Sequence, residues 1–585
     1  MIAAILCVSV TLAAPAPRLV QFDLASYLAS LPIDGTDRYD ALKFVTALQG
    51  VVNRDAPRLI LRLSPDDSSM DAYWLSVLRQ GWLKGWALDR VADIGTLLAC
   101  FPESKRGVVV WDPAVPATAN VAATACGVEG WLPVRANSGL HRRLVESGPK
   151  LPVRLSLEGM FTGSETGSRK CDAYLWAKRT YLDAGRCHPA LMAYYCDAFP
   201  GGVGGQDTLP NQDYFIARRA FFFDLLPWAD EAPVDDPAQP LGTDKRTLEA
   251  LLQAQYRQNK GRQFTSVGGF VPWNVKYTDA AGAGGRHGAV NTEWEYAAIL
   301  SAHNAILDAD AVGPYSMANA SAYRHHPLKK RYKQNPRPAS RPLENKTYVL
   351  VYMGDYDSAA WLSNSIAAIW DDPARGSLPI AWAFNPNLAD RVPYVFDHVY
   401  RTKTANDWFI AGDSGAGYLN PTLLAGERRG SGLPNALELW VKHNTKRYAR
   451  FGYSITGFVI DGFAGDMPLE VQLAYAKFSP DGVGMQLGFA APLAGGAPFI
   501  RHVGDIYPDP PRGIAAAVDQ MAGAAQPSGP QFLLFRMILQ TPSTLRAIRD
   551  GLCEKYPDRN WEFCDPYTFF DLYKRSIENA ATPRR

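Results

Sequence analysis

Several features that mark other protein classes are missing from this sequence. Its 585 residues contain no apolar run of the ~20 residues that a membrane-spanning helix requires. Positive and negative charges nearly cancel, with 60 Lys and Arg against 58 Asp and Glu, so the charge does not indicate nucleic-acid binding. There is no C-x-x-C pair, and no G-x-G-x-x-G follows a predicted strand. We therefore expect no integral membrane segment, no nucleic-acid partner, no bound metal and no cofactor.

The first 16 residues have the pattern of a secretory signal peptide. The apolar stretch IAAILCVSVTLA begins at Ile2 and is followed by alanines and prolines, although no Lys or Arg precedes it. Removal of residues 1–16 would leave seven of the eight cysteines, and an exported protein can oxidise them to disulfides. The sequence thus predicts a protein that is secreted or otherwise extracytoplasmic.

The remaining cysteines fall into three local groups. These are Cys100 and Cys126, then Cys171, Cys187 and Cys196, and finally Cys553 and Cys564. We expect one disulfide within each group, including one between Cys553 and Cys564. The pairing inside the second group is left open, because connectivity does not follow from spacing.

After residue 16, the pattern of the sequence changes three times along the chain. Residues 17–155 and 156–335 mix helical and strand patterns, and each is predicted to contain α/β structure. Residues 336–346 belong to a basic, Pro-rich stretch, which we expect to be a solvated linker because its prolines prevent a continuous helix. Residues 347–585 make up the last part.

Within residues 347–585, seven buried-looking apolar runs are mostly separated by helical segments. The runs are TYVLVYM, PIAWAF, WFIAG, ITGFVID, GVGMQLGFA, PFIRHV and QFLLFRMIL. This alternation predicts a (β/α) barrel of seven or eight strands, with an open doubly wound sheet as the alternative. In a barrel, the loops after the carboxyl ends of the strands form the face that carries the chemistry.

Acidic residues recur at the predicted carboxyl ends of these strands. They are Asp355, Asp357, Asp413, Asp461 and Asp505. The aromatic residues Trp361, Trp382 and Phe463 accompany them, and flat apolar rings among acids suit the mixed polar and C–H surface of a sugar. An Asp after a strand also commonly caps the next helix, so each acid has a purely structural explanation as well.

The stretch WFIAGDSGAGYLNP, residues 408–421, leads from an apolar run into a loop of small and polar residues. Gly415 and Gly417 would allow a tight turn and a close approach of the backbone to a ligand. Ser414, Tyr418 and Asn420 add polar groups to the same loop. We expect this loop to line a binding site, with a plain connector as the alternative.

Residues 415–421, GAGYLNP, resemble the signature of the GxGYxYP glycoside hydrolases, with Asn420 in place of the second tyrosine. The stretches LQGVVNR (residues 48–54) and GGFVPWNVKYT (residues 268–278) are similar to that family too. The resemblance implies a C-terminal barrel of the glycoside hydrolase/deacetylase type after smaller α/β domains, and a carbohydrate substrate or ligand. It also implies that Asp355 and Asp357 match the acids of an Asp-Gly-Asp-Asn-type turn.

The leading hypothesis is a glycoside hydrolase that cleaves an oligo- or polysaccharide with two carboxyl groups. One of them protonates the leaving oxygen and the other acts as nucleophile or base. We select Asp355 and Asp461 as this catalytic pair. The residues expected to bind substrate are Asp357, Asp413, Ser414, Gly415, Gly417, Tyr418, Asn420, Trp361, Trp382, Phe463 and Asp505.

Two other functions are compatible with the same residues. A non-catalytic carbohydrate-binding protein would keep the aromatic residues and the glycine loop while tolerating the loss of an acid. A metal-dependent carbohydrate deacetylase would need His ligands, but the nine histidines form no H-x-x-x-H pair and only His502 lies near a predicted strand end. The deacetylase is therefore the weakest of the three hypotheses.

Overall fold

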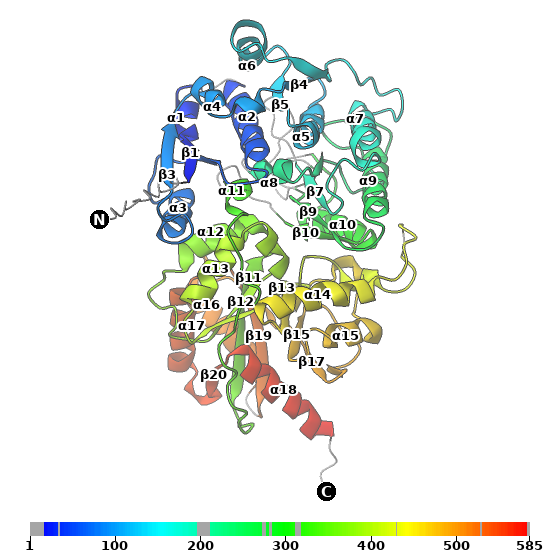
Figure 1. The fold of residues 1–585 in the computed structure, drawn as a ribbon. Helices are drawn as coiled ribbons and strands as arrows, with labels where there is room; N and C mark the ends of the chain where they lie inside the picture. The colour runs from blue at the N-terminus through cyan, green and yellow to red at the C-terminus, as the bar shows by residue number, and fades with distance from the viewer. Residues whose placement is uncertain are drawn as a thin grey trace, which may run out of the picture.

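The computed structural model describes residues 17–32, 36–195, 211–271, 277–279, 284–309, 317–428, 430–509, 511–526 and 529–581. The predicted signal peptide and Cys196 lie outside these ranges. The protein is of the mixed α/β class, with one large curled sheet and three small parallel sheets. The small sheets lie in the upper half of Figure 1, and the large sheet lies in the lower half.

The first 156 residues contain two separate three-stranded sheets. The first has the order β2-β1-β3, from β1 (Arg18–Phe22), β2 (Leu59–Leu61) and β3 (Ala87–Val91). The second has the order β5-β4-β6, from β4 (Val108–Trp111), β5 (Leu132–Arg135) and β6 (Val153–Ser156). Two almost completely buried helices, α2 (Asp37–Val52) and α5 (Thr118–Glu129), pack between these elements and the next sheet. The smaller helices are α1 (Leu24–Ala29), α3 (Met70–Gln80), α4 (Ile94–Cys100) and α6 (Gly139–His141).

The middle part forms a four-stranded parallel sheet with the order β10-β9-β7-β8. Its strands are β7 (Leu191–Tyr194), β8 (Phe221–Phe223), β9 (Thr265–Gly268) and β10 (Ala305–Asp308). Its helices are α7 (Arg169–Ala177), α8 (Gln212–Ala217), α9 (Thr243–Asn259), α10 (Ala289–Ala302) and α11 (Ala320–Tyr323). Strands β7, β8 and β10 are buried along their whole length, as expected for parallel strands covered on both faces.

The large sheet confirms the seven apolar runs predicted as strands after residue 346. Its members are β11 (Thr347–Tyr356), β12 (Ile380–Phe384), β13 (Asp407–Asp413), β14 (Ile455–Val459), β15 (Gly482–Met485), β16 (Leu493–Ala494), β17 (Ala497–Arg501), β18 (Gly504–Ile506), β19 (Gln531–Ile538) and β20 (Trp561–Phe563). The order is β16-β17-β15-β14-β13-β12-β11-β19-β18, and β20 pairs with β11. All pairs are parallel except β16 with β17.

The large sheet curls because residues 497–506 form one bent segment that pairs with two strands far apart in the sheet order. Strand β17 pairs with β15, and β18 pairs with β19, although only His502 and Val503 separate β17 from β18. The result is a curled half-barrel. A closed (β/α) barrel, which the sequence predicted, is not confirmed.

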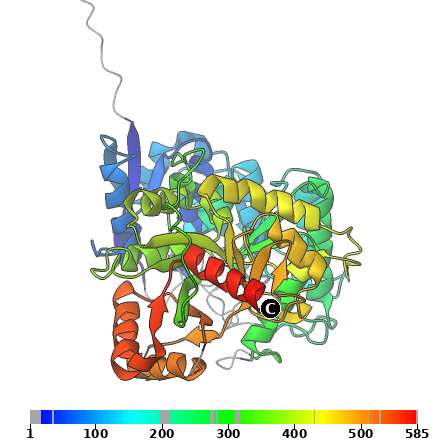
Figure 2. The ribbon, with the colours of Figure 1, turned by 90° about the horizontal axis from the view of Figure 1, so that it is seen from below.

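Helices follow most of these strands, as the sequence predicted. They are α12 (Ala359–Ile369), α13 (Pro393–Thr402), α14 (Leu437–Phe451), α15 (Leu469–Ala476), α16 (Gly513–Ala524), α17 (Pro542–Lys555) and α18 (Pro566–Ala581). The Ser358 hydroxyl caps α12 by accepting the Trp361 amide at 3.0 Å. Helix α18, red in Figure 2, crosses the side of the molecule opposite the small sheets.

The carboxyl ends of the large sheet lie against the middle part. The amide of Leu307 in β10 donates to the carbonyl of Tyr418 at 2.8 Å. The carboxylate of Asp308 accepts the amide of Ala359 at 2.8 Å and the guanidinium of Arg391 at 2.9 Å. Helix α10 also contacts the short helices 421–424 and 462–464 that follow β13 and β14. The loops after the carboxyl ends of these strands, which the sequence predicted to form the functional face, therefore lie at the junction between the large sheet and the middle part.

Residues 336–346, the predicted linker, form no helix or strand, and residues 336–340 are exposed. Arg337 pairs with Asp481 and Arg341 pairs with Glu562, which connects this segment to the large sheet. The six described cysteines are free thiols, contrary to the expected pairing of Cys553 with Cys564. Cys553 is exposed on α17 whereas Cys564 is buried. No helix in the described part of the chain is long and apolar enough to cross a membrane.

Candidate functional site

Three of the predicted acids come together at the carboxyl ends of β11 and β13. Asp355 and Asp357 lie at the end of β11, and Asp413 is the last residue of β13. Burial raises the pKa of Asp357 well above its usual range, and the charges of Asp355 and Asp413 raise it further. Asp355 has a φ of 75°, a left-handed conformation that is costly for any residue but glycine. Such backbone strain is typical of functional sites.

Asp413 is the most deeply buried member of this acidic cluster. Its side chain belongs to a residue that is only 4% exposed, and Oδ1 accepts a long hydrogen bond of 3.5 Å from the Tyr352 hydroxyl. Oδ2 has no hydrogen-bond partner among the described residues. Burial and the charge of Asp355 raise the pKa of Asp413 to about 7, against the opposing charge of Arg536. This carboxyl group can therefore hold a proton near neutral pH.

Arg536 in β19 supplies the positive charge of the site. Its Nε and Nη2 donate to the two carboxylate oxygens of Asp505 at 2.8 and 2.7 Å. Its Nη1 lies 3.9 Å from Oδ1 of Asp355. Burial acts to raise the pKa of Asp505, but the hydrogen bonds and charge of Arg536 outweigh it, so the pKa is lowered. Asp505 is thus an ionised partner that orients Arg536.

The middle part contributes a fourth carboxylate, which sequence reasoning missed. Glu293 in α10 accepts a hydrogen bond of 2.7 Å from the buried Tyr418 hydroxyl. Its charge also acts to raise the pKa of Asp357. Tyr418 is therefore placed beside the acidic cluster, as predicted, although its phenol is bound within the protein. No local signal marks Glu293, because acids are common in helices and its partner is 125 residues away in the chain.

The carboxylate of Asp461, predicted as a catalytic acid, is hydrogen-bonded to Thr422. Its Oδ1 accepts the amide of Thr422 at 3.1 Å, and its Oδ2 accepts the Thr422 hydroxyl at 3.0 Å. Burial raises its pKa to about 7, which these two hydrogen bonds oppose. No hydrogen bond joins Asp461 to Asp355 among the described residues, but two catalytic carboxyl groups normally stand ~5–9.5 Å apart, so their pairing stays a prediction.

The glycine loop is buried throughout rather than open to a ligand. The Ser414 hydroxyl donates to the carbonyl of Ile460 at 3.3 Å, and the Asn420 amide group donates to the same carbonyl at 3.0 Å. A Cβ atom on Gly415 would lie 2.5 Å from Asn444 Oδ1, and one on Gly417 would lie 2.7 Å from the Ile306 side chain. These glycines allow close packing against protein. The close approach that the structure shows at both positions is to protein atoms, and an approach to a ligand stays a prediction.

The predicted aromatic residues divide into core and surface. Trp382 is completely buried and donates its Nε1 proton to Asp407 at 2.8 Å, so it is a core residue. Trp361 is half-buried on α12. Phe463 is 50% exposed and packs edge-on against Trp294 at 5.4 Å. Phe463 is therefore the predicted ring best placed to contact a ligand.

His502 lies beside the same site. Its Nε2 donates to the carbonyl of Gly457 at 2.8 Å, and burial lowers its pKa to about 4, so the ring is neutral at physiological pH. Among the residues the structure describes, no group of three or more His, Cys, Asp and Glu has the arrangement of a metal site.

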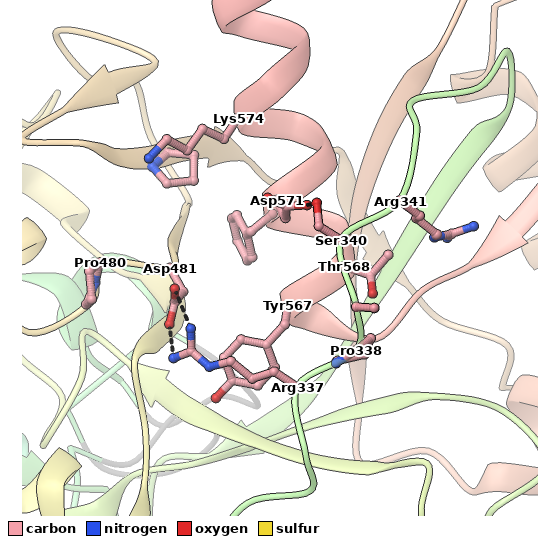
Figure 3. A pocket seen from close by; sticks show the side chains of 13 residues that line it. Arg337, Pro338, Ser340, Arg341, Pro480, Asp481, Tyr567, Thr568, Asp571 and Lys574 are labelled. Carbon is pink, nitrogen blue, oxygen red and sulfur yellow. Dashed lines mark hydrogen bonds and ion pairs between the residues drawn. The ribbon is translucent and has the colours of Figure 1, made fainter.

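A pocket of about 260 Å³ lies at the opposite, amino-terminal ends of β15 and β17 (Figure 3). The guanidinium of Arg337 pairs with Asp481 and lies 4.7 Å from the ring centre of Tyr567. Asp571 accepts hydrogen bonds from Ser340 and Arg575, and Lys574 donates to the carbonyl of Gly496. Because its charged side chains already have partners within the protein, this pocket is a weaker candidate than the acidic cluster.

The fold and the acidic cluster define a mixed α/β protein with several carboxyl groups at the carboxyl ends of parallel strands. Residues 345–491 match the family model described as "GxGYxYP putative glycoside hydrolase C-terminal domain", which confirms the resemblance for this segment. A solved structure of a putative hydrolase from Bacteroides thetaiotaomicron has a similar fold, with a TM-score of 0.65 and 15% identity over 96% of this chain and 95% of that one. No curated protein matches the chain.

Proposed function

We propose that the protein is a glycoside hydrolase and that the acidic cluster is its catalytic site. The observation that carries this proposal is the contrast between two neighbouring carboxyl groups. Asp413 is almost completely buried with a pKa of about 7, whereas the Asp355 side chain is 35% exposed and lies near Arg536. A glycosidase needs one protonated and one ionised carboxyl group, and different environments are the usual way to obtain them.

In this proposal Asp413 is the general acid and Asp355 is the nucleophile or base. Oδ2 of Asp413 is buried and makes no hydrogen bond to the described protein, so a proton on it is not committed to a protein acceptor. Burial raises the pKa of Asp355 above its usual value, and the charge of the nearby Arg536 opposes this by favouring the ionised form. This assignment replaces the predicted pair of Asp355 with Asp461, because the carboxylate of Asp461 is held by Thr422.

The name of the matched family and the description of the similar structure as a putative hydrolase support the proposal. A carbohydrate ligand agrees with the exposed ring of Phe463, which Trp294 supports from behind. We expect Phe463→Ala to raise KM for an oligosaccharide while kcat changes little, since the ring would bind the sugar away from the reacting bond.

The test is reducing-sugar release from a panel of oligo- and polysaccharides by the wild type and three variants. Asp413→Asn and Asp355→Asn keep the size of each side chain but remove the ionisable group, so turnover should fall by ~10²–10⁴-fold. Asp461→Asn is the matched control, because an amide can keep both contacts with Thr422. We expect its turnover to stay within about threefold of the wild type.

The pH profile is a second test of the same assignment. Because the general acid must carry its proton, kcat/KM should decline as the pH rises through about 7, the pKa of Asp413. Loss of activity in Asp461→Asn with normal activity in the other two variants would refute the assignment. A wild type that binds glycans but releases no sugar from any of them would favour a non-catalytic carbohydrate-binding protein.

A further inference from the structure

A cavity of about 860 Å³ with several cationic side chains in its lining lies between the middle part and the large sheet. It is lined by residues around β7, β9 and β10 on one side, and by α14 and the short helix 386–390 on the other. None of the acids Asp355, Asp357, Asp413 and Glu293 lines it. The cavity is thus separate from the proposed catalytic site.

The charges around this cavity do not balance. Two carboxylates line it, and each already has a cation, since Asp308 pairs with Arg391 and Asp390 pairs with Arg447. Six further cations form no ion pair with a carboxylate among the described residues, although Asp55 and Asp213 still act on Arg324: Arg218, Arg262, Arg324, Lys442, Lys446 and Arg450. Gathering like charges around one cavity is unfavourable unless an anion compensates them.

The histidines of the cavity do not add to the charge. Burial lowers the pKa of His188 to about 4, and the nearby Arg218 lowers it further. Burial likewise lowers the pKa of His443 to about 3, with Arg447 acting in the same direction. Burial also lowers the pKa of His326, the third histidine of the lining, so the three rings are mainly neutral at physiological pH.

The contact between Arg218 and His188 favours a bound anion more directly than the uneven charges do. Nδ1 of His188 accepts the amide of Ala190 at 3.1 Å, so the proton of the neutral ring is on Nε2. Nη2 of Arg218 lies 3.0 Å from that Nε2, which brings two donors together. The Nε atoms of Arg218 and Arg324 are also buried without a hydrogen-bond partner. Unsatisfied buried donors of this kind are costly, and an anion would satisfy them.

We propose that this cavity is a binding site for a small ligand with at least two carboxylate, sulfate or phosphate groups. Its volume is in the range of ~300–1,000 Å³ that is common for small-molecule sites. Guanidinium groups bind such planar or tetrahedral anions through paired N–H donors. The proposal does not depend on the glycoside hydrolase activity, because the two sites share none of the residues that carry them.

Isothermal titration calorimetry on the full chain tests the proposal with four probes in about 20 mM NaCl, where screening of charges is weak. Digalacturonate, a disulfated disaccharide and inorganic pyrophosphate carry the three anionic groups, and cellobiose is the neutral control. We expect at least one anionic probe to bind and cellobiose not to bind in this cavity. The relative affinities of the three anions then identify which charged group the site prefers. Binding should weaken when NaCl is raised to about 0.3 M.

The double variant Lys442→Gln/Lys446→Gln locates the binding. Both lysines are exposed on α14, so their replacement should leave the fold intact. We expect affinity for the preferred anion to fall about three- to tenfold, the range for the loss of two partly exposed charges. Lys84→Gln/Lys105→Gln removes two exposed lysines that do not line the cavity and should bind as the wild type does.

Arg218→Gln provides an independent check, because it removes the donor that faces His188. It should weaken binding further while the circular dichroism spectrum stays that of the wild type. Absence of binding by all three anionic probes at millimolar concentration would overturn the proposal. So would equal losses in the two lysine double variants, because the effect would then come from net charge and not from this cavity.

Discussion

Replacement of Gly417 by alanine tests whether the glycine loop is a packing element. Gly417 has a φ of 131°, and a Cβ atom there would lie 2.7 Å from Ile306 Cδ1 and 2.9 Å from Ile306 Cβ. The backbone conformation costs ~1–3 kcal/mol for a residue with a side chain. Overpacking against β10 adds ~1–3 kcal/mol. Gly417→Ala should therefore lower the free energy of unfolding by roughly 2–6 kcal/mol.

Gly426→Ala measures the cost of the backbone conformation without the cost of overpacking. Gly426 has a φ of 57°, but a Cβ atom there would meet nothing within 4 Å. This variant should cost only the backbone term of ~1–2 kcal/mol. Guanidinium-induced unfolding, followed by tryptophan fluorescence and circular dichroism, measures both. If Gly417→Ala proves no less stable than Gly426→Ala, the close contact with Ile306 is not what requires a glycine.

Three further predictions concern titration, thiols and export. The pKa of Asp461 is 3.8 when unfolded and about 7 when folded, so the folded state binds the extra proton and stability falls as the pH rises from about 4 to 7. Asp461→Asn should flatten this dependence in unfolding curves at about pH 5 and 8, and an unchanged slope would contradict the assignment. Iodoacetamide should label Cys553 in the native protein but Cys564 only after unfolding, whereas a disulfide between them in non-reduced peptides would contradict the structure. Mass spectrometry of the exported protein should find a mature chain that begins near residue 17, and an intact N-terminus would remove the prediction of a signal peptide.

The sequence was sufficient for much of the C-terminal secondary structure. Apolar runs between helical segments are a local signal, and runs such as TYVLVYM and QFLLFRMIL became β11 and β19. The same signal located the carboxyl ends of the strands, and with them Asp355, Asp357 and Asp413. It could not decide how the sheet curls, because the curl depends on the bent segment 497–506 pairing with β15 through β17 and with β19 through β18, two strands that lie far apart in the sheet order.

The sequence also left open what lies beside the glycine loop. Small and polar residues around Gly415 and Gly417 have the composition of a ligand-binding loop, and equally of a tightly packed junction. Composition does not distinguish the two. The structure does, because Asn444 and Ile306 occupy the space beside these glycines.

The sequence by itself therefore determined the strands, the helices and the acids at the strand ends, since each depends on neighbours a few residues away. Only the tertiary structure decided which acids meet. A position at a strand end does not fix where its side chain points, so Asp413 faces the cluster while Asp461 faces Thr422. The contributions of Glu293 and Arg536 were equally hidden, because each reaches its partner only after separate parts of the chain have packed together.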